Sequence, residues 1–210
     1  MTLRSARLVA FDGTHASGKT TLLYAVAALL RRQGIHVGVL GEPARQSPFV
    51  DDVVIHKSGD FDMLLELDLF AAQIINCVRG ARSYDLVLAD KTLTNVLAYC
   101  KMVVATQPGT WDGQMVEAME TFCRAWGTAY DVVFYCQDFY GVSQPGDEYR
   151  SKVAHLQAKA DELVRAEYAA LNQPLTLVPR SLDVDERASW VIDQLKQLHL
   201  ITQKGPLDEH

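Results

Sequence analysis

The sequence predicts an α/β fold in which a five-stranded parallel sheet is covered by helices on both faces. Five short apolar runs alternate with longer segments of helical spacing; the runs are residues 8–11, 36–40, 86–89, 132–136 and 175–178. Runs that are apolar throughout are typical of parallel strands buried on both faces. Ligands of such sheets lie beyond the carboxyl ends of the strands, so chemistry is expected in the loops that follow these runs.

The segments between the runs predict the helices. Residues 18–34 have a helical pattern that ends at Gly34, because glycine readily adopts the left-handed conformation that closes many helices. Within residues 61–84, apolar side chains recur every three or four positions, which indicates one face of a long helix. These side chains are Leu64, Leu67, Ala71, Ile74 and Val78. Further helices are expected over residues 92–127 (two helices, broken near 107–109), 151–172 and 188–198.

Composition and charge exclude several classes of protein. The chain has 210 residues, 49% of them hydrophobic, which is too apolar for a disordered protein. Its 20 basic and 26 acidic residues give a net charge of −6, which argues against a general nucleic-acid or membrane-surface binder. The longest apolar run, residues 22–30, is far shorter than the roughly 20 residues of a membrane-spanning helix. We expect one domain over residues 1–202 and a flexible tail over 203–210, in the cytoplasm and away from membranes.

The cysteines are widely spaced and include no Cys-x-x-Cys pair. They are Cys77, Cys100, Cys123 and Cys136. In a chain without a secretory signal, such thiols are expected to be reduced and to lie in or near the core. We therefore expect no metal or redox role for them.

A phosphate-binding motif follows the first apolar run. Residues 13–20 match the pattern G-x-x-x-x-G-K-[ST], with a predicted strand before them and a predicted helix after them, as a P-loop requires. With the next residue of the helix included, the residues expected to hold a nucleotide are Gly13, Thr14, His15, Ala16, Ser17, Gly18, Lys19, Thr20 and Thr21. The sequence therefore predicts a three-layer P-loop NTPase fold.

The parts of the motif have separate roles. Glycines let the loop curl so that successive backbone N–H groups point at phosphate oxygens, and the helix N-terminus adds its partial positive charge. Lys19 supplies a full charge to the β- and γ-phosphates, and the Thr20 hydroxyl is suited to ligate Mg²⁺. The variable positions of the pattern tolerate many residues, so His15 is interpreted as a loop filler and not as a catalytic group.

Other pieces of the sequence stand in a characteristic order. Phe11-Asp12-Gly13-Thr14 is followed by Leu40-Gly41-Glu42-Pro43, by Leu69-Phe70-Ala71-Ala72-Gln73, and by Asp90-Lys91 with Ala98-Tyr99. In this order they resemble the thymidylate kinase and deoxynucleoside kinase branch of P-loop kinases, and they are also similar to nicotinamide-riboside-kinase-like P-loop proteins. The resemblance covers most of residues 7–180. The sequence lacks the Asn-Lys-x-Asp motif with which small GTPases select guanine.

The resemblance implies roles for three strand-end residues. Glu42 would contact the phosphate acceptor or act as its base, and Arg45 would bind an acceptor phosphate. Asp90 would hold Mg²⁺ through water or help to activate the acceptor hydroxyl, since in-line phosphoryl transfer needs a metal site and an oriented nucleophile. The alternatives are a solvent-exposed strand end for Glu42 and a helix N-cap for Asp90.

Two positions depart from the family pattern. Lys91 stands where the family has Arg, and Lys cannot make the two-pronged contact that a guanidinium makes with phosphate. Ile74 stands where thymidylate kinases carry an Arg that grips the substrate phosphate. The neighbouring Gln73 would read a base or sugar by hydrogen bonds, or else lie at the helix surface. Gln73 and Lys91 join Glu42 and Arg45 as substrate-binding candidates, and the departures weaken the case for a nucleoside monophosphate acceptor.

A lid is expected over about residues 138–152, where these kinases carry a mobile segment. Its Arg150 and Lys152 would close over the transferring phosphate and neutralise its charge. Arg150 is therefore a catalytic candidate together with Lys19, Glu42 and Asp90. The alternative is an exposed first turn of the next helix. The resemblance also implies a homodimer formed through the long helices.

These features predict a kinase that uses ATP and Mg²⁺ to phosphorylate a small molecule, with a nucleoside or nucleotide as the expected acceptor. One alternative is a different acceptor: an antibiotic, another metabolite, or a nucleoside within a nucleic acid. In this acidic chain the nucleic-acid version requires a contiguous basic strip near Arg79, Arg82 and Lys91. The other alternative is a regulatory switch, in which the bound nucleotide changes partner binding and turnover is slow.

Overall fold

Five parallel strands form one sheet in the order β2-β3-β1-β4-β5. The structure is a computed structural model and describes residues 6–51, 61–106, 108–138, 140 and 157–202. The strands are β1 (Arg7–Asp12), β2 (Val37–Leu40), β3 (Leu86–Asp90), β4 (Val132–Tyr135) and β5 (Thr176–Leu177). The predicted α/β fold is confirmed, with a fifth strand shorter than the predicted 175–178.

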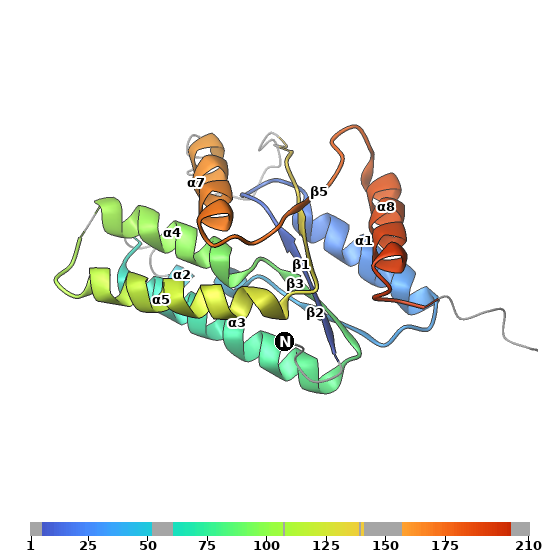
Figure 1. Ribbon diagram of the computed structural model, residues 1–210, viewed down its shortest axis with the longest axis horizontal. Coiled ribbons are helices and arrows are strands. Elements are labelled where there is room, and N and C mark those ends of the chain that lie inside the picture. Colours follow the sequence, from blue (N-terminus) through green and yellow to red (C-terminus); the bar gives the residue numbers. More distant parts are fainter. Residues whose placement is uncertain (1–5, 52–60, 107, 139, 141–156, 203–210) are drawn as a thin grey trace, which may run out of the picture.

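Helices cover both faces of this sheet (Figure 1). On one side lie α1 (Lys19–Arg32) and α8 (Val184–Gln197), which pack against each other. On the other side lie α3 (Met63–Ser83), α4 (Leu93–Thr106), α5 (Asp112–Trp126) and α7 (Gln157–Ala170). Three short turns that the sequence did not predict are η1 (Pro43–Arg45), α2 (Pro48–Asp51) and η3 (Gly127–Ala129).

The face under α1 and α8 is an apolar core. Alternate strand residues point to opposite faces, so Val9 and Phe11 of β1 pack here while Leu8 and Ala10 point to the other side. The helices contribute side chains at helical spacing; these include Leu22, Leu23, Val26 and Leu30 from α1, and Val191 and Leu195 from α8. Among the buried residues of α1 and α8, Lys19 and Arg187 are charged and the others are apolar.

The long helix α3 is confirmed, but the apolar stripe found in the sequence is not its buried face. Leu64 of that stripe is 65% exposed, and Ala71 and Val78 are also exposed. The buried face instead includes two polar residues, Glu66 and Gln73. The stripe is therefore offset from the buried face, because Glu66 and Gln73 interrupt the apolar pattern of that face, while Leu67 and Ile74 of the stripe still pack against the core.

The cysteines are free thiols and all are buried, as predicted. Burial raises the pKa of Cys77 and of Cys136 to about 12, so neither is a reactive thiolate. Within the described parts of the chain, no helix is long and apolar enough to cross a membrane.

All strands run in the same direction, so their carboxyl ends meet at one edge of the sheet. This edge is at the top of Figure 1, opposite the marked N-terminus. The P-loop follows β1 at this edge, Glu42 follows β2, and Asp90 ends β3. The fold thus gathers the predicted site residues from distant parts of the sequence.

Candidate functional site

The P-loop joins β1 to α1 and turns through left-handed backbone. Gly13, Ala16 and Gly18 have φ angles of 138°, 52° and 79°, a region that favours glycine. A Cβ added to Gly13 would lie 2.5 Å from the carbonyl oxygen of Cys136. The loop conformation therefore requires glycine at the first position of the motif.

Positive charge is concentrated where α1 begins. The first turn of α1 contains no acidic residue, so no side chain of the helix itself opposes the partial positive charge of its N-terminus. Lys19 is buried, and its Nζ donates a hydrogen bond of 3.0 Å to the carbonyl of Thr14. The ammonium thus lies against the loop whose amides are expected to bind phosphate.

A cavity opens beside the P-loop. It is lined by residues 15–21 together with Glu42 and Arg45. The structure thus brings predicted nucleotide-binding residues next to two of the predicted acceptor-binding residues. His15 also packs its ring edge-on against Tyr99 of α4, with the ring centroids 5.5 Å apart.

Thr20 and Asp90, the two predicted metal ligands, are in direct contact. Thr20 Oγ1 donates a hydrogen bond of 2.6 Å to Asp90 Oδ2. Asp90 is 1% exposed, and its Oδ1 has no hydrogen-bond partner. Burial raises the pKa of Asp90 above its ordinary value, against the opposing effect of Lys19.

This pair fits a magnesium ion. A hydroxyl and a carboxylate with a free oxygen are hard oxygen ligands of the kind that Mg²⁺ prefers. No cluster of three or more His, Cys, Asp or Glu residues in the described segments could hold a metal by itself. Mg²⁺ commonly takes only one or two ligands from the protein and the rest from water and substrate phosphates, so a two-residue site is sufficient.

Asp90 is not the N-cap of the following helix. The helix α4 begins at Leu93, and Thr92 Oγ1 accepts a hydrogen bond of 3.2 Å from the backbone N–H of Asn95. Thr92 therefore caps the helix, and the capping alternative for Asp90 is wrong.

Glu42 is buried between two cations. Its Oε1 lies 2.7 Å from Lys91 Nζ, and its Oε2 lies 3.4 Å from Arg45 Nε. Glu42 is only 8% exposed, so the alternative of a solvent-exposed strand end is wrong. Burial acts to raise the pKa of Glu42, but the charges of Lys91 and then Lys19 lower it well below its ordinary value. Burial acts to lower the pKa of Lys91, but Glu42 raises it, so both groups remain ionised.

Gln73 is fully buried, so the alternative of a surface glutamine is also wrong. Its Nε2 donates a hydrogen bond of 2.7 Å to the carbonyl of Lys91. Lys91 has a φ angle of 74°, which is uncommon for a residue with a side chain. Gln73 thus supports the strained backbone that directs Lys91 toward Glu42.

A buried carboxylate that the sequence interpretation missed lies at the end of β1. Asp12 accepts hydrogen bonds from the Gly13 N–H at 2.6 Å, from Thr92 Oγ1 at 2.7 Å, from the Tyr168 hydroxyl and from the Asn95 amide. Burial raises its pKa, and the bond from Tyr168 is the largest opposing effect. Asp12 therefore ties the P-loop to α4 and α7. The one signal in the sequence is an Asp directly before the motif.

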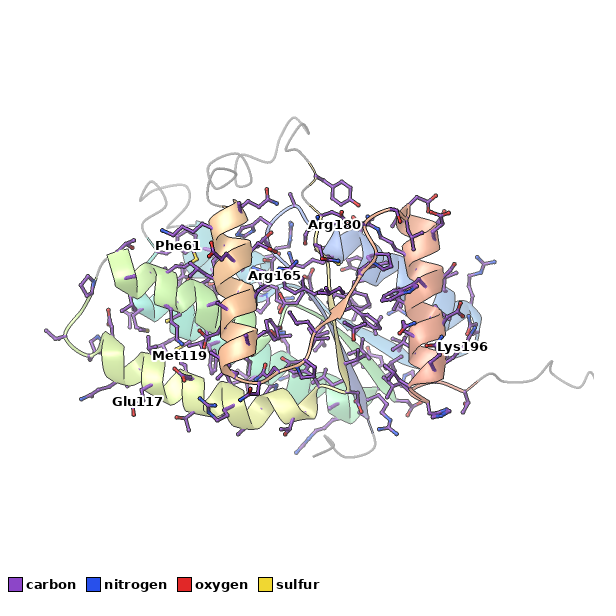
Figure 2. The ribbon with its side chains drawn as sticks, turned by 45° about the horizontal axis from the view of Figure 1, so that its top comes forward. Phe61, Glu117, Met119, Arg165, Arg180 and Lys196 are labelled. Carbon is purple, nitrogen blue, oxygen red and sulfur yellow. The ribbon has the colours of Figure 1, made fainter. Side chains whose placement is uncertain are left out.

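Most of the predicted lid, including Arg150 and Lys152, lies outside the described residues. The described part contacts the P-loop, since the Tyr140 N–H donates a hydrogen bond of 2.9 Å to the carbonyl of Ala16. Asp138 forms a 2.6 Å ion pair with Arg187 of α8. Arg187 also donates to the carbonyl of Arg180, which Figure 2 labels between β5 and α8. The connection after β4 is therefore held on both the P-loop and α8.

The fold and the site together define a P-loop NTPase: a parallel α/β sheet, a phosphate-binding loop between β1 and α1, and a Thr–Asp pair beside it. A family model described as an AAA domain matches residues 8–187. The chain therefore belongs to this AAA-domain family. None of the curated proteins matches it.

Solved structures with a similar fold include two of a NadR protein and one of a thymidylate kinase. The NadR protein in complex with NR has a TM-score of 0.68 and 15% identity, over 97% of this chain and 54% of that chain. Thymidylate kinase from Candida albicans has a TM-score of 0.64 and 13% identity, over 93% of both chains. NadR in complex with NAD and AMP-PNP has a TM-score of 0.61 and 17% identity, over 97% and 52% of the two chains.

The chain thus spans about half the length of the two NadR chains. At these identities the shared feature is the fold. The predicted resemblance to the thymidylate kinase branch, and to riboside-kinase-like P-loop proteins, is confirmed at that level.

Proposed function

We propose that the protein is an ATP- and Mg²⁺-dependent phosphotransferase whose acceptor is a nucleoside or nucleotide. The observation that carries this proposal is the cavity that the P-loop shares with Glu42 and Arg45. Binding a nucleotide requires only the loop. A buried carboxylate and an arginine beside the loop suit a second bound molecule, held in position for transfer.

On the donor side, Lys19 and the loop amides would hold the β- and γ-phosphates. Thr20 and Asp90 would hold Mg²⁺, which when bound neutralises charge that develops on the phosphates during transfer. We also propose that Arg150 adds positive charge as the site closes, which would exclude the water that otherwise hydrolyses ATP.

On the acceptor side, we assign Glu42 to orientation and not to proton abstraction. A carboxylate whose pKa is strongly lowered is a weak base near neutral pH. It remains a good hydrogen-bond acceptor, so it can align an acceptor hydroxyl toward the donor phosphate. Lys91 and Arg45 fix its orientation.

Other features of the proposal extend the family resemblance. The similar folds of thymidylate kinase and NadR support a small-molecule acceptor. The nucleic-acid alternative lacks its required surface, because Lys91 is buried and cannot extend a basic strip from Arg79 and Arg82.

We further propose one domain over residues 1–202, acting in the cytoplasm as a homodimer.

ADP release across a panel of nucleosides, nucleotides, aminoglycosides and sugars tests this function. Turnover should rise sharply with at least one nucleoside or nucleotide and depend on Mg²⁺. A response confined to the aminoglycosides or sugars would contradict the acceptor class. Slow turnover that stays flat across the whole panel would instead favour the regulatory switch.

A further inference from the structure

A buried hydrogen-bond network, here called the Asp12 network, lies beneath the P-loop at the end of β1. At its centre is the Asp12 carboxylate, which is completely buried and accepts hydrogen bonds from four groups. The donors are the Gly13 N–H at 2.6 Å, the Thr92 hydroxyl at 2.7 Å, the Tyr168 hydroxyl and the Asn95 amide. The cavity beside the P-loop is lined by other residues. The network therefore lies behind the loop and not in the cavity.

Both oxygens of the Asp12 carboxylate are occupied. Its Oδ1 accepts from Gly13 and Asn95, and its Oδ2 accepts from Thr92 and Tyr168. An ionised carboxylate offers about four acceptor sites, so these donors use all of them. The network thus joins the P-loop to α4 through Asn95 and to α7 through Tyr168.

The network acts on the P-loop through Gly13. The N–H of Gly13 binds Asp12, and its carbonyl accepts a hydrogen bond of 3.4 Å from Asn95 Nδ2. Gly13 has a φ angle of 138°. A glycine can adopt many other backbone conformations, so its sequence alone does not hold the loop in this one. The two hydrogen bonds select the conformation from which the rest of the loop continues.

Helix α7 contacts the loop at a second point. The Gln157 amide, in the first turn of α7, donates a hydrogen bond to the carbonyl of His15. Gln157 and Tyr168 are separated by about three helical turns, so they lie on the same face of α7. That face therefore holds the P-loop both at its base, through Asp12, and near its middle, through His15.

We propose that Asp12 and Tyr168 are positioning residues for phosphate binding, which hold the P-loop in the conformation that receives the phosphates of the nucleotide. This inference rests on the nucleotide binding of the proposed function and deepens it. The loop amides bind phosphate well only when several of them point at it together. A loop already held in that arrangement loses less conformational entropy on binding. When the arrangement is only partly populated, the observed affinity falls by that fraction.

Tyr135 of β4 separates this role from a contribution to stability alone. Its ring is also buried, and its hydroxyl donates a hydrogen bond of 2.7 Å to a carboxylate of α7, Asp161 Oδ1. The rings of Tyr135 and Tyr168 pack edge-on, with centroids 6.4 Å apart. Asp161 pairs with Arg165 and not with the P-loop. Tyr135→Phe therefore removes a similar hydrogen bond from the same region without releasing the loop.

Four variants test the inference: Tyr168→Phe, Asp12→Ala, Asp12→Asn and the control Tyr135→Phe. Isothermal titration without acceptor measures the Kd for MgATP, and thermal melting measures stability. Asp12→Asn is the conservative variant. Its amide oxygen can still accept from Gly13 and Asn95, and its NH₂ group can donate to the hydroxyls of Thr92 and Tyr168, which also act as acceptors.

We expect Tyr168→Phe to raise the Kd for MgATP about tenfold, the equivalent of one hydrogen bond to a charged group. Asp12→Ala should raise it at least as much. Tyr135→Phe and Asp12→Asn should stay within about threefold of the wild type, even where Tyr135→Phe lowers the Tm as much as Tyr168→Phe does.

Two results would overturn the inference and leave the proposed function standing, provided that the wild type binds MgATP. One is a Kd for Tyr168→Phe that matches the Kd for Tyr135→Phe. The other is an Asp12→Asn variant as weak as Asp12→Ala, because the charge of Asp12 and not its hydrogen bonds would then matter. If Asp12→Ala does not fold, the comparison of the two tyrosine variants decides. A wild type that does not bind MgATP would remove the proposed function and this inference with it.

Discussion

The two faces of the sheet are built differently. Under α1 and α8 the core is apolar, and among the described residues of these two helices only Lys19 and Arg187 are buried polar side chains. On the opposite side, the burial extends to polar groups at the carboxyl edge of the sheet; these include Asp12, Glu66, Gln73, Thr92 and Asn95. Burying polar groups lowers stability unless partners satisfy them, and several on this side have unsatisfied atoms. The difference indicates that the first face stabilises the fold and that the second, with the P-loop edge, serves binding.

The largest loss of activity should come from a substitution in the P-loop, which lies at the edge where both faces of the sheet meet. Lys19→Ala should reduce transfer by at least about a hundredfold, because it removes the full charge that faces the phosphates. Steady-state kinetics measures this. Lys196→Ala is the matched control, since Lys196 lies at the far end of α8 and, among the described residues, forms its ion pair with Asp193 (Figure 2). Near-normal turnover of Lys19→Ala would contradict the P-loop assignment.

On the polar face, Glu42→Gln should reduce transfer by roughly a hundredfold while sparing ATP affinity. The amide cannot hold the Lys91 ammonium or align a hydroxyl as the carboxylate does. Isothermal titration with ATP and single-turnover transfer separate the two effects. The double variant Glu42→Gln with Lys91→Met should recover stability without recovering transfer. If ATP affinity falls instead, Glu42 contacts the nucleotide and not the acceptor.

On the apolar face, Leu23→Ala should lower the free energy of unfolding by about 2–5 kcal/mol, a fall in Tm of roughly 5–15 °C, without changing kcat at a temperature where it is folded. Leu23 is completely buried, so the substitution leaves a cavity. Leu64→Ala is the control, because Leu64 is largely exposed and should change stability by less than about 0.5 kcal/mol. A large effect of Leu64→Ala would restore the apolar stripe as the buried face of α3.

The smallest effect concerns the pH dependence of stability. The pKa of Glu66 is about 8 in the folded protein against an ordinary value of 4.5, so the unfolded state loses the proton first. This carboxyl therefore makes the folded state less stable as pH rises from about 4.5 to about 8. In the absence of acceptor, Glu66→Gln should match the wild type near pH 5 and melt several degrees higher at pH 8. Thermal melts across this range measure the difference, and a gap that does not grow with pH would show that Glu66 is not desolvated.

The sequence predicted the parallel sheet and the P-loop well, because apolar strand runs and the P-loop glycines are local signals. It also predicted two residues that the structure brings into contact beside the P-loop, Thr20 from the motif and Asp90 from a strand end. It did not predict Asp12 or Glu66 as buried groups. A carboxylate on a helix or beside a turn resembles a surface residue until tertiary packing covers it. The hydropathy stripe of α3 failed for the same reason.

The central claim is that the P-loop and the adjoining polar residues transfer phosphate to a second small molecule. Mass spectrometry of acceptors incubated with ATP, Mg²⁺ and the protein tests it most directly. We expect a product heavier by one phosphoryl group, formed with an equal amount of ADP by the wild type and lost in Lys19→Ala. ADP formed together with free phosphate, and no phosphorylated acceptor, would contradict it.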